Sequence, residues 1–96
     1  MYYDMSKWDL SGFKKSKTRG KMYDAILKNK LARNKTVRLP FGSIFYENYW
    51  DKTGLNLYPH LIHGDKKRRK SYKARHKVYL KDGYYSPGWL SYNFLW

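Results

Sequence analysis

The sequence contains no cysteine, little glycine or proline and no long apolar run, and each shortage excludes a class of protein. Without cysteine the chain can form no disulfide, has no thiol nucleophile and cannot build a zinc site on thiolates. No apolar run approaches the roughly 18 residues that a membrane-spanning helix needs. Its 96 residues leave room for one small domain. We therefore expect a single domain with no membrane span.

Acidic residues are also scarce, with 7 of them against 21 lysines and arginines, a formal net charge of +14. Aromatic residues make up 20% of the chain, which excludes a fully disordered polycation, because such chains are poor in aromatics. The aliphatic stock is thin, so aromatic rings must supply much of the core. The charge excess opposes compaction until an acidic partner neutralises it. The composition therefore indicates a protein that binds a polyanion or an acidic protein surface.

The positive charge is concentrated in two segments, residues 13–21 with five basic residues and residues 66–77 with eight. Lysine and arginine bind phosphates and carboxylates, so we predict anion or partner binding by Lys14, Lys15, Lys17, Arg19, Lys66, Lys67, Arg68, Arg69, Lys70, Lys73 and Lys77. Aromatic segments follow each basic one. Because Trp and Tyr dominate the cores of interfaces, we expect these side chains to anchor a protein partner: Tyr49, Trp50, Trp89 and Trp96.

Local patterns predict an α+β fold. We expect residues 1–20 to be an extended basic N-terminal arm, with an exposed loop from residue 14, ahead of a small domain at residues 21–96. Residues 21–31 fit either a helix or a strand. Residues 36–39 indicate a strand that Pro40 should end or confine to a sheet edge. Residues 41–63 then form an aromatic loop with short turns.

Two helices are expected in the last third of the chain. Asp65 is the predicted N-cap of a basic helix that runs to about Tyr79. Ser86 followed by Pro87 is typical of the start of a helix, here a short C-terminal one. On the basic helix, spacings of three and four bring together one set of residues: Arg68, Tyr72, Arg75 and His76. This set forms an anion clamp, or Arg75 and His76 fix the C-terminal helix by packing against Trp89 or Trp96.

A more specific pattern lies mainly in residues 60–96. Its members are Val37, Phe41-Gly42, Tyr49, His60, Asp65, Arg69, Tyr72, the run 75–77, the segment 88–91 and Leu95-Trp96. With these residues the chain resembles a family of small basic proteins of unknown function encoded by giant and other large nucleocytoplasmic DNA viruses. The resemblance implies a viral origin and a β-hairpin ahead of Phe41-Gly42. It favours the structural role for Tyr72, Arg75 and His76, and it implies no activity.

No arrangement of catalytic or metal-binding residues is recognisable. The acidic residues are scattered, and the sequence has neither a nucleophile elbow nor a glycine-rich phosphate loop. His60, His63 and His76, with Asp65, are the candidates for a metal site. Zinc sites need three or four ligands, and the cationic surroundings weaken cation binding. We therefore predict a non-enzymatic protein without catalytic residues, cofactor or metal.

Two binding functions fit these expectations. The first is a structural component of a large DNA virus particle, a minor capsid-type protein. Its basic segments would contact acidic surfaces of larger viral structural proteins, and its aromatic residues would anchor it. That protein would reside in the virion, and in the host cytoplasm or nucleus during assembly. The alternative is a protein that binds the DNA or RNA phosphate backbone of the viral genome without sequence specificity.

Overall fold

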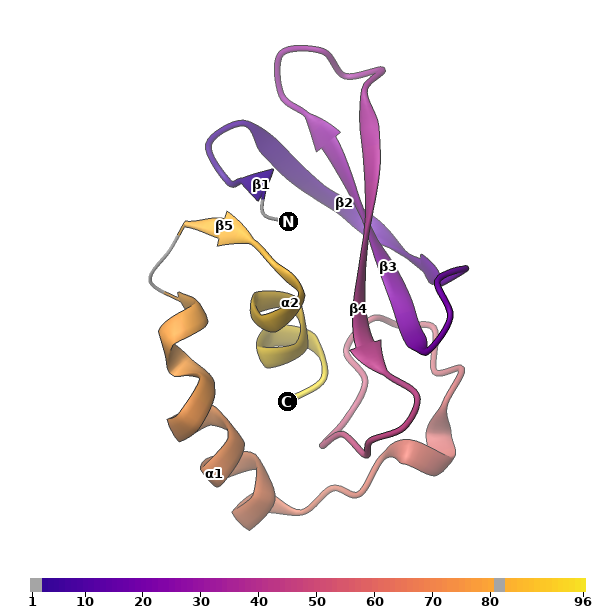
Figure 1. Cartoon of the computed structure of the whole chain (residues 1–96), viewed down its shortest axis with the longest axis vertical. Coiled ribbons are helices and arrows are strands. Elements are labelled where there is room, and N and C mark those ends of the chain that lie inside the picture. The colour runs from indigo at the N-terminus through magenta and orange to yellow at the C-terminus, as the bar shows by residue number, and fades with distance from the viewer. Residues whose placement is uncertain (1–2, 81–82) are drawn as a thin grey trace.

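Alternating apolar residues in the first half of the chain build an antiparallel three-stranded sheet. The computed structural model describes residues 3–80 and 83–96. Strands β2 (Trp8–Lys15), β3 (Lys21–Asn29) and β4 (Thr36–Ser43) lie in the order β2-β3-β4 (Figure 1). Helices α1 (Lys66–His76) and α2 (Pro87–Phe94) complete the fold. The predicted α+β class is confirmed.

The central strand β3 supplies most of the core. Tyr23, Ala25 and Leu27 alternate along it and are fully buried, because side chains two apart in a strand point to one face. In the register, Tyr23 lies opposite Phe41 of β4. Helix α2 covers this face through residues such as Leu90. Of residues 21–31, the first nine therefore form a strand, Lys21–Asn29, and the hairpin implied ahead of Phe41-Gly42 is present.

The opposite face of the sheet carries a buried carboxylate. Asp24 is 3% exposed. It accepts hydrogen bonds from the Ser16 hydroxyl at 2.6 Å and from Arg38 Nε at 2.9 Å. Ser16 follows β2 and Arg38 belongs to β4, so Asp24 ties both neighbouring strands to the central one. A buried charge is tolerated when it is paired and hydrogen-bonded in this way.

The predicted separate arm is wrong for residues 3–20, and so is the domain boundary at residue 20, whereas residues 1–2 lie outside the described residues. Within the described residues, β2 pairs with β3 along its length, from Trp8 opposite Asn29 to Lys15 opposite Tyr23. A second, two-stranded sheet joins β1 (Tyr3–Asp4) to β5 (Tyr84–Tyr85), just ahead of α2. The apolar residues of β2 pack on the core. The content of serine, glycine and lysine indicated an exposed loop, but the burial of these apolar side chains favours the strand. Of the expected loop, only residues 16–20 remain one.

Of the two outcomes predicted for Pro40, the position at a sheet edge is confirmed and the end of the strand is not. Strand β4 continues through Pro40 to Ser43, and it is an edge strand, where a residue without an N–H is tolerated. Gly42 then adopts φ +74°, and a Cβ there would lie 2.9 Å from Leu95 Cδ1. The end of the chain therefore packs directly against the end of β4.

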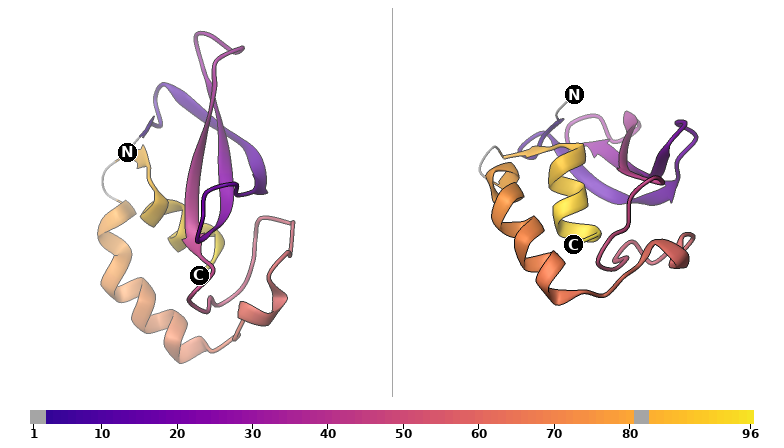
Figure 2. Two further views of the ribbon diagram at one scale, coloured as in Figure 1. Left: turned by 45° about the vertical axis from the view of Figure 1, so that its right-hand side comes forward. Right: turned by 60° about the horizontal axis from the view of Figure 1, so that its bottom comes forward.

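A long segment wraps from β4 to the basic helix, as both views in Figure 2 show. It is irregular apart from a 3₁₀ turn, Pro59–Leu61. The buried hydroxyl of Tyr23 holds it by donating a hydrogen bond to Asp51 and accepting one from the Leu57 amide at 3.0 Å. Burial, followed by the bond to Asp51, raises the pKa of Tyr23 to about 12. Tyr23 thus links the core to the aromatic loop.

Both predicted N-caps are confirmed. The Asp65 carboxylate accepts from the amides of Lys67 and Arg68, and the Ser86 hydroxyl accepts from the Trp89 amide at 3.1 Å. Helix α1 ends at His76, earlier than the predicted residue 79, and a 3₁₀ turn (Lys77–Leu80) continues it.

We expect Asp24→Asn to lower the free energy of unfolding by about 1–3 kcal/mol, because the change removes the charge that Arg38 and Ser16 need. The matched control is Asp9→Asn. The side chain of Asp9 is 48% exposed and pairs with Lys30 and Arg33 at the surface, so its loss should cost about 1 kcal/mol or less. Urea denaturation of both variants measures the difference. Equal effects would show that Asp24 does not tie the strands together.

Candidate functional site

Helix α1 buries none of its residues, and it is held to the rest of the chain by aromatic and cationic contacts. The Tyr72 ring stacks on Trp96 with centroids 4.1 Å apart and planes 4° from parallel. Arg69 Nε donates a hydrogen bond to the main-chain oxygen of Trp96 at 2.8 Å. Lys73 lies over the Tyr92 ring of α2, 4.9 Å from its centroid. One side of α1 therefore faces the protein and the remainder faces solvent.

Two predicted anion-binding residues serve this docking instead. Arg69 lies over the rings of Tyr49 and Trp50, at 5.0 and 5.5 Å. Lys73 is half-buried, and burial, followed by the nearby charge of Arg69, lowers the pKa of its amine. Their positive charges stabilise the aromatic loop and α2. Arg69 and Lys73 are therefore removed from the set of residues available to an anion.

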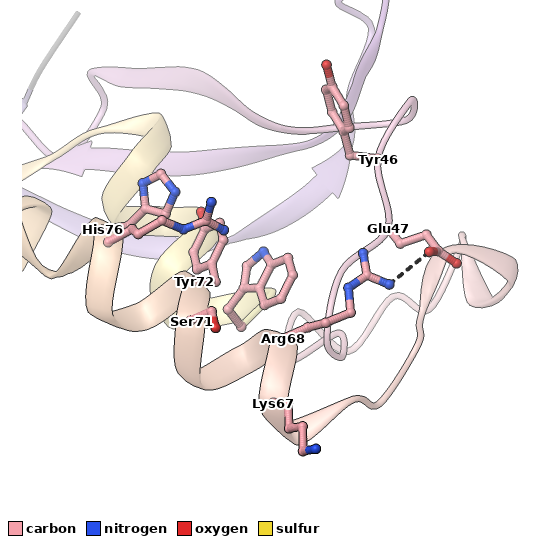
Figure 3. A pocket seen from close by; sticks show the side chains of 9 residues that line it. Tyr46, Glu47, Lys67, Arg68, Ser71, Tyr72 and His76 are labelled. Atoms are coloured by element: carbon pink, nitrogen blue, oxygen red, sulfur yellow. Dashed lines mark hydrogen bonds and ion pairs between the residues drawn. The ribbon is translucent and has the colours of Figure 1, made fainter.

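A groove of about 460 Å³ runs between α1 and the segment after β4 (Figure 3). Its lining is Tyr46, Glu47, Lys67, Arg68, Ser71, Tyr72, Arg75, His76 and Trp96. The stacked pair Tyr72 and Trp96 contributes rings, and three of the side chains are permanently positive. Glu47 is the single acid among the lining residues. The arrangement offers aromatic surface and positive charge to an elongated anion.

The ion pair between Arg68 and Glu47 crosses this groove, with a distance of 3.0 Å between its charged atoms (Figure 3). Its side chains are 48% and 52% exposed. Such surface pairs contribute about 0–1 kcal/mol, so a stronger anion such as phosphate can take the place of Glu47 on the guanidinium. Arg68 is therefore available for binding.

A second groove, of about 310 Å³, adjoins the first. Both are lined by Tyr46, Glu47, Tyr72 and Trp96. Lys21, at the start of β3, lines the second groove, which places one residue of the first basic segment near α1. The predicted binding residues Lys14, Lys15, Lys17 and Arg19 line neither groove; they are exposed at the end of β2 and in the turn after it.

The described part of the chain leaves α1 with an uncompensated charge. Of its four ion pairs, three lie on the sheet and only that of Arg68 involves α1. No acid lies in the first turn of α1, where basic residues oppose the helix dipole. In α1 and at the residue directly after it, the exposed cations that have no ion pair among the described residues are Lys66, Lys67, Lys70, Arg75 and Lys77. This face attracts an anion from outside the chain.

The predicted aromatic anchors point mostly into the chain's own core. Trp96 is 8% exposed, and Tyr49 and Trp89 are half-buried against the core. Trp50 is 40% exposed, with Lys52 over its ring. Three of the four are therefore unavailable as anchors for a partner.

Among the described residues, the two most exposed aromatic rings are Phe45 and Tyr46, which are 75% and 74% exposed. Sequence reasoning missed both, because they stand in an apolar run that directly follows a buried strand, where nothing local distinguishes a surface ring from a core ring.

The structural role expected for the helix residues is correct for Tyr72 and wrong for Arg75. Tyr72 stacks on Trp96, and the His76 ring lies 4.2 Å from that of Tyr72. Arg75 is exposed and lines the groove. Among the described residues, the arginine that makes cation–π contacts is Arg69, because it lies on the docked side of α1. Arg68 and Arg75 thus share the groove, as the clamp alternative required.

His63 lies beside Trp96, in surroundings that disfavour its charged form. Its Nδ1 accepts from the Asp65 amide at 2.8 Å, and its ring lies 5.1 Å from that of Trp96. Burial, followed by the charge of Arg68, lowers its pKa below the ordinary 6.5, against smaller opposing effects of Glu47 and Asp65. In the described part of the chain Nε2 has no hydrogen-bond partner. His63 therefore acts as a packing residue.

Residues 3–80 and 83–96 contain no group of three histidines and carboxylates placed to hold a metal ion. Within the same described ranges, no helix combines the length and the apolar character needed to cross a membrane.

We expect Tyr72→Ala to loosen α1 selectively. The change removes the stack on Trp96, which contributes about 1–2 kcal/mol, and α1 has no buried side chain to compensate. Amide hydrogen exchange should become faster in α1, while β3 keeps its protection. Ser71→Ala, an exposed change one residue away, should leave α1 unaffected. Unchanged exchange in the Tyr72 variant would contradict this account of the docking.

We expect the stability of the protein to fall as the pH is lowered from 7 to 5. The lowered pKa of His63 means that the unfolded chain binds a proton that the folded chain resists, so stability is lost as the pH falls below about 6.5. Urea midpoints should therefore decrease in this range. His63→Gln should flatten the decrease, and His60→Gln, at an exposed position, should not. A decrease of the same size in all three proteins would exclude His63 as its cause.

A scan against protein-family models finds no match to this chain. Searches among curated proteins and solved structures likewise find no significant match. The resemblance to the viral family therefore stays a prediction.

Proposed function

We propose that this protein binds nucleic acid through the phosphate backbone, without sequence preference, on the solvent face of α1. The observation that carries the proposal is the row of α1 cations that have no ion pair among the described residues, next to a groove with a single acid. Phosphates release condensed counterions when they meet such cations, which is the main source of nonspecific affinity. Contacts of this kind position a protein on the backbone and carry no base information.

The placement of the aromatic residues supports this proposal over the minor capsid-type role. An anchor for a protein partner must be able to enter a pocket of that partner, whereas Trp96 is buried in its own chain. The lysines and arginines of α1 other than Arg69 and Lys73 are exposed to solvent. The role as a component of a virus particle, with its location, rests on the resemblance alone and stays a prediction.

We also propose that the two grooves bind a ligand and do not catalyse a reaction. The grooves bring together cations, aromatic rings and one carboxylate. Paired carboxylates are a usual part of a hydrolytic site, whereas the residues that line the two grooves include one acid, Glu47. The chain's residues are suited to holding an anion.

We expect the affinity for random-sequence duplex DNA to depend steeply on salt. Arg68, the four unpaired cations of α1 and Lys77 directly after it offer about six phosphate contacts, so affinity should fall about 10³-fold between roughly 50 and 200 mM salt. Fluorescence anisotropy of a labelled duplex measures this. Lys67→Gln and Arg75→Gln should each lower the slope of log affinity against log salt by about 0.9.

The control for these variants is Lys35→Gln, which removes the same charge from the exposed turn between β3 and β4 and should leave the slope nearly unchanged. Glu47→Gln should strengthen binding, since it frees Arg68. Weak binding at low salt, or equal effects of the Lys67 and Lys35 variants, would overturn the proposal.

A further inference from the structure

We propose that the protein prefers single-stranded nucleic acid to a duplex, and that the unpaired bases stack on Phe45 and Tyr46. This inference rests on the proposed function and adds the class of nucleic acid to it. The two rings are adjacent in sequence and about three-quarters exposed, in a chain whose other aromatic residues largely fill its core. Large rings at such exposure, on a protein with a small core, leave apolar surface in water that stacked bases would cover.

The backbone beneath these rings is fixed. The Ile44 amide donates to the Gly20 carbonyl at 3.1 Å, and the Phe45 amide donates to the Ser43 hydroxyl at 3.1 Å. The Phe45 ring lies against Gly20, where an added Cβ would stand 3.2 Å from ring atom Cε2. Gly20 has φ +82°, which suits glycine. The platform is therefore ordered before a ligand arrives, and binding loses less conformational entropy.

Positive charge flanks the rings on two sides. The turn under Phe45 carries Lys17 and Arg19, both exposed. Tyr46 lines both grooves, one with Lys21 and the other with Arg68. In Figure 3 Tyr46 stands at the rim of the groove, on the strand side opposite α1. A flexible strand that stacks a base on either ring can thus place its phosphates toward both basic segments of the sequence.

This geometry favours a single strand over a duplex. In a duplex each base face is covered by the neighbouring pair, so the rings would add nothing to the phosphate contacts. In a single strand the faces are open, and base–aromatic stacking is tolerant of sequence because every base has a π face. The two rings therefore distinguish a single strand from a duplex without recognising the base sequence. This agrees with the proposed backbone contacts, which carry no sequence information.

The test compares a labelled oligothymidylate with a labelled duplex by anisotropy at one low salt concentration. Phe45→Leu and Tyr46→Leu keep apolar bulk at these exposed positions and remove the π face. Each should weaken single-strand binding by about fivefold or more, and Phe45→Leu, at a ring that lines neither groove, should leave duplex binding unchanged. Tyr46→Phe keeps the ring and should bind like the wild type. Leu31→Ala, at a side chain that is 97% exposed on the far turn, is the control.

The two proposals can fail separately. If the leucine variants bind the single strand as the wild type does, or lose duplex binding equally, the stacking inference is overturned, whereas a steep salt dependence would still support backbone binding. If neither nucleic acid binds in a salt-dependent manner, the proposed function fails and the inference with it. If the wild type and the leucine variants bound an acidic protein equally well and bound neither nucleic acid, both proposals would be overturned.

Discussion

The stack of Tyr72 on Trp96 is the contact on which the proposed site depends. Helix α1 buries no residue, so it is held to the protein by this stack, by the Arg69 bond to Trp96 and by the cation–π contacts of Arg69 and Lys73. Trp96 itself is fixed because Leu95 packs against Gly42 and Met22 at the end of the sheet. The sheet thus contacts Leu95, and the neighbouring Trp96 contacts the basic helix. Trp96 also lines both grooves.

The distribution of the few acids decides where positive charge remains. Asp24 and Asp9 neutralise cations of the sheet, and Asp51 holds the loop through Tyr23. Each is used within the fold, so the described part of the chain provides α1 with Glu47 and the capping Asp65 only. Most of the positive charges on α1 therefore stay unpaired within the described residues, as do those at the end of β2 and in the turn after it. An anion bound to α1 would reduce the repulsion within this helix and stabilise its docking.

Features with a local cause could be predicted from the sequence, and features set by distant contacts could not. The N-caps at Asp65 and Ser86 follow from side chains that bond amides two or three residues away. Strand β2 was missed because its partner is β3, across a turn rich in residues typical of exposed loops. The aromatic side chains show the same limit: composition required aromatic residues in the core, but tertiary packing decided that Trp96 is buried and that Phe45 is exposed. The sequence alone shows that α1 is basic. That Arg69 packs against the protein depends on the tertiary positions of Tyr49 and Trp50, which the sequence does not show.

The central claim is that the solvent face of α1 and the adjoining segment after β4 form the anion-binding surface. Backbone amide chemical shifts, recorded during titration with an oligothymidylate at low salt, test it most directly. The account predicts perturbations concentrated in residues 42–48 and 66–77, reversed by added salt, with little change in the turn at residues 30–35. Perturbations spread evenly over all basic surfaces, or centred on that turn, would contradict it.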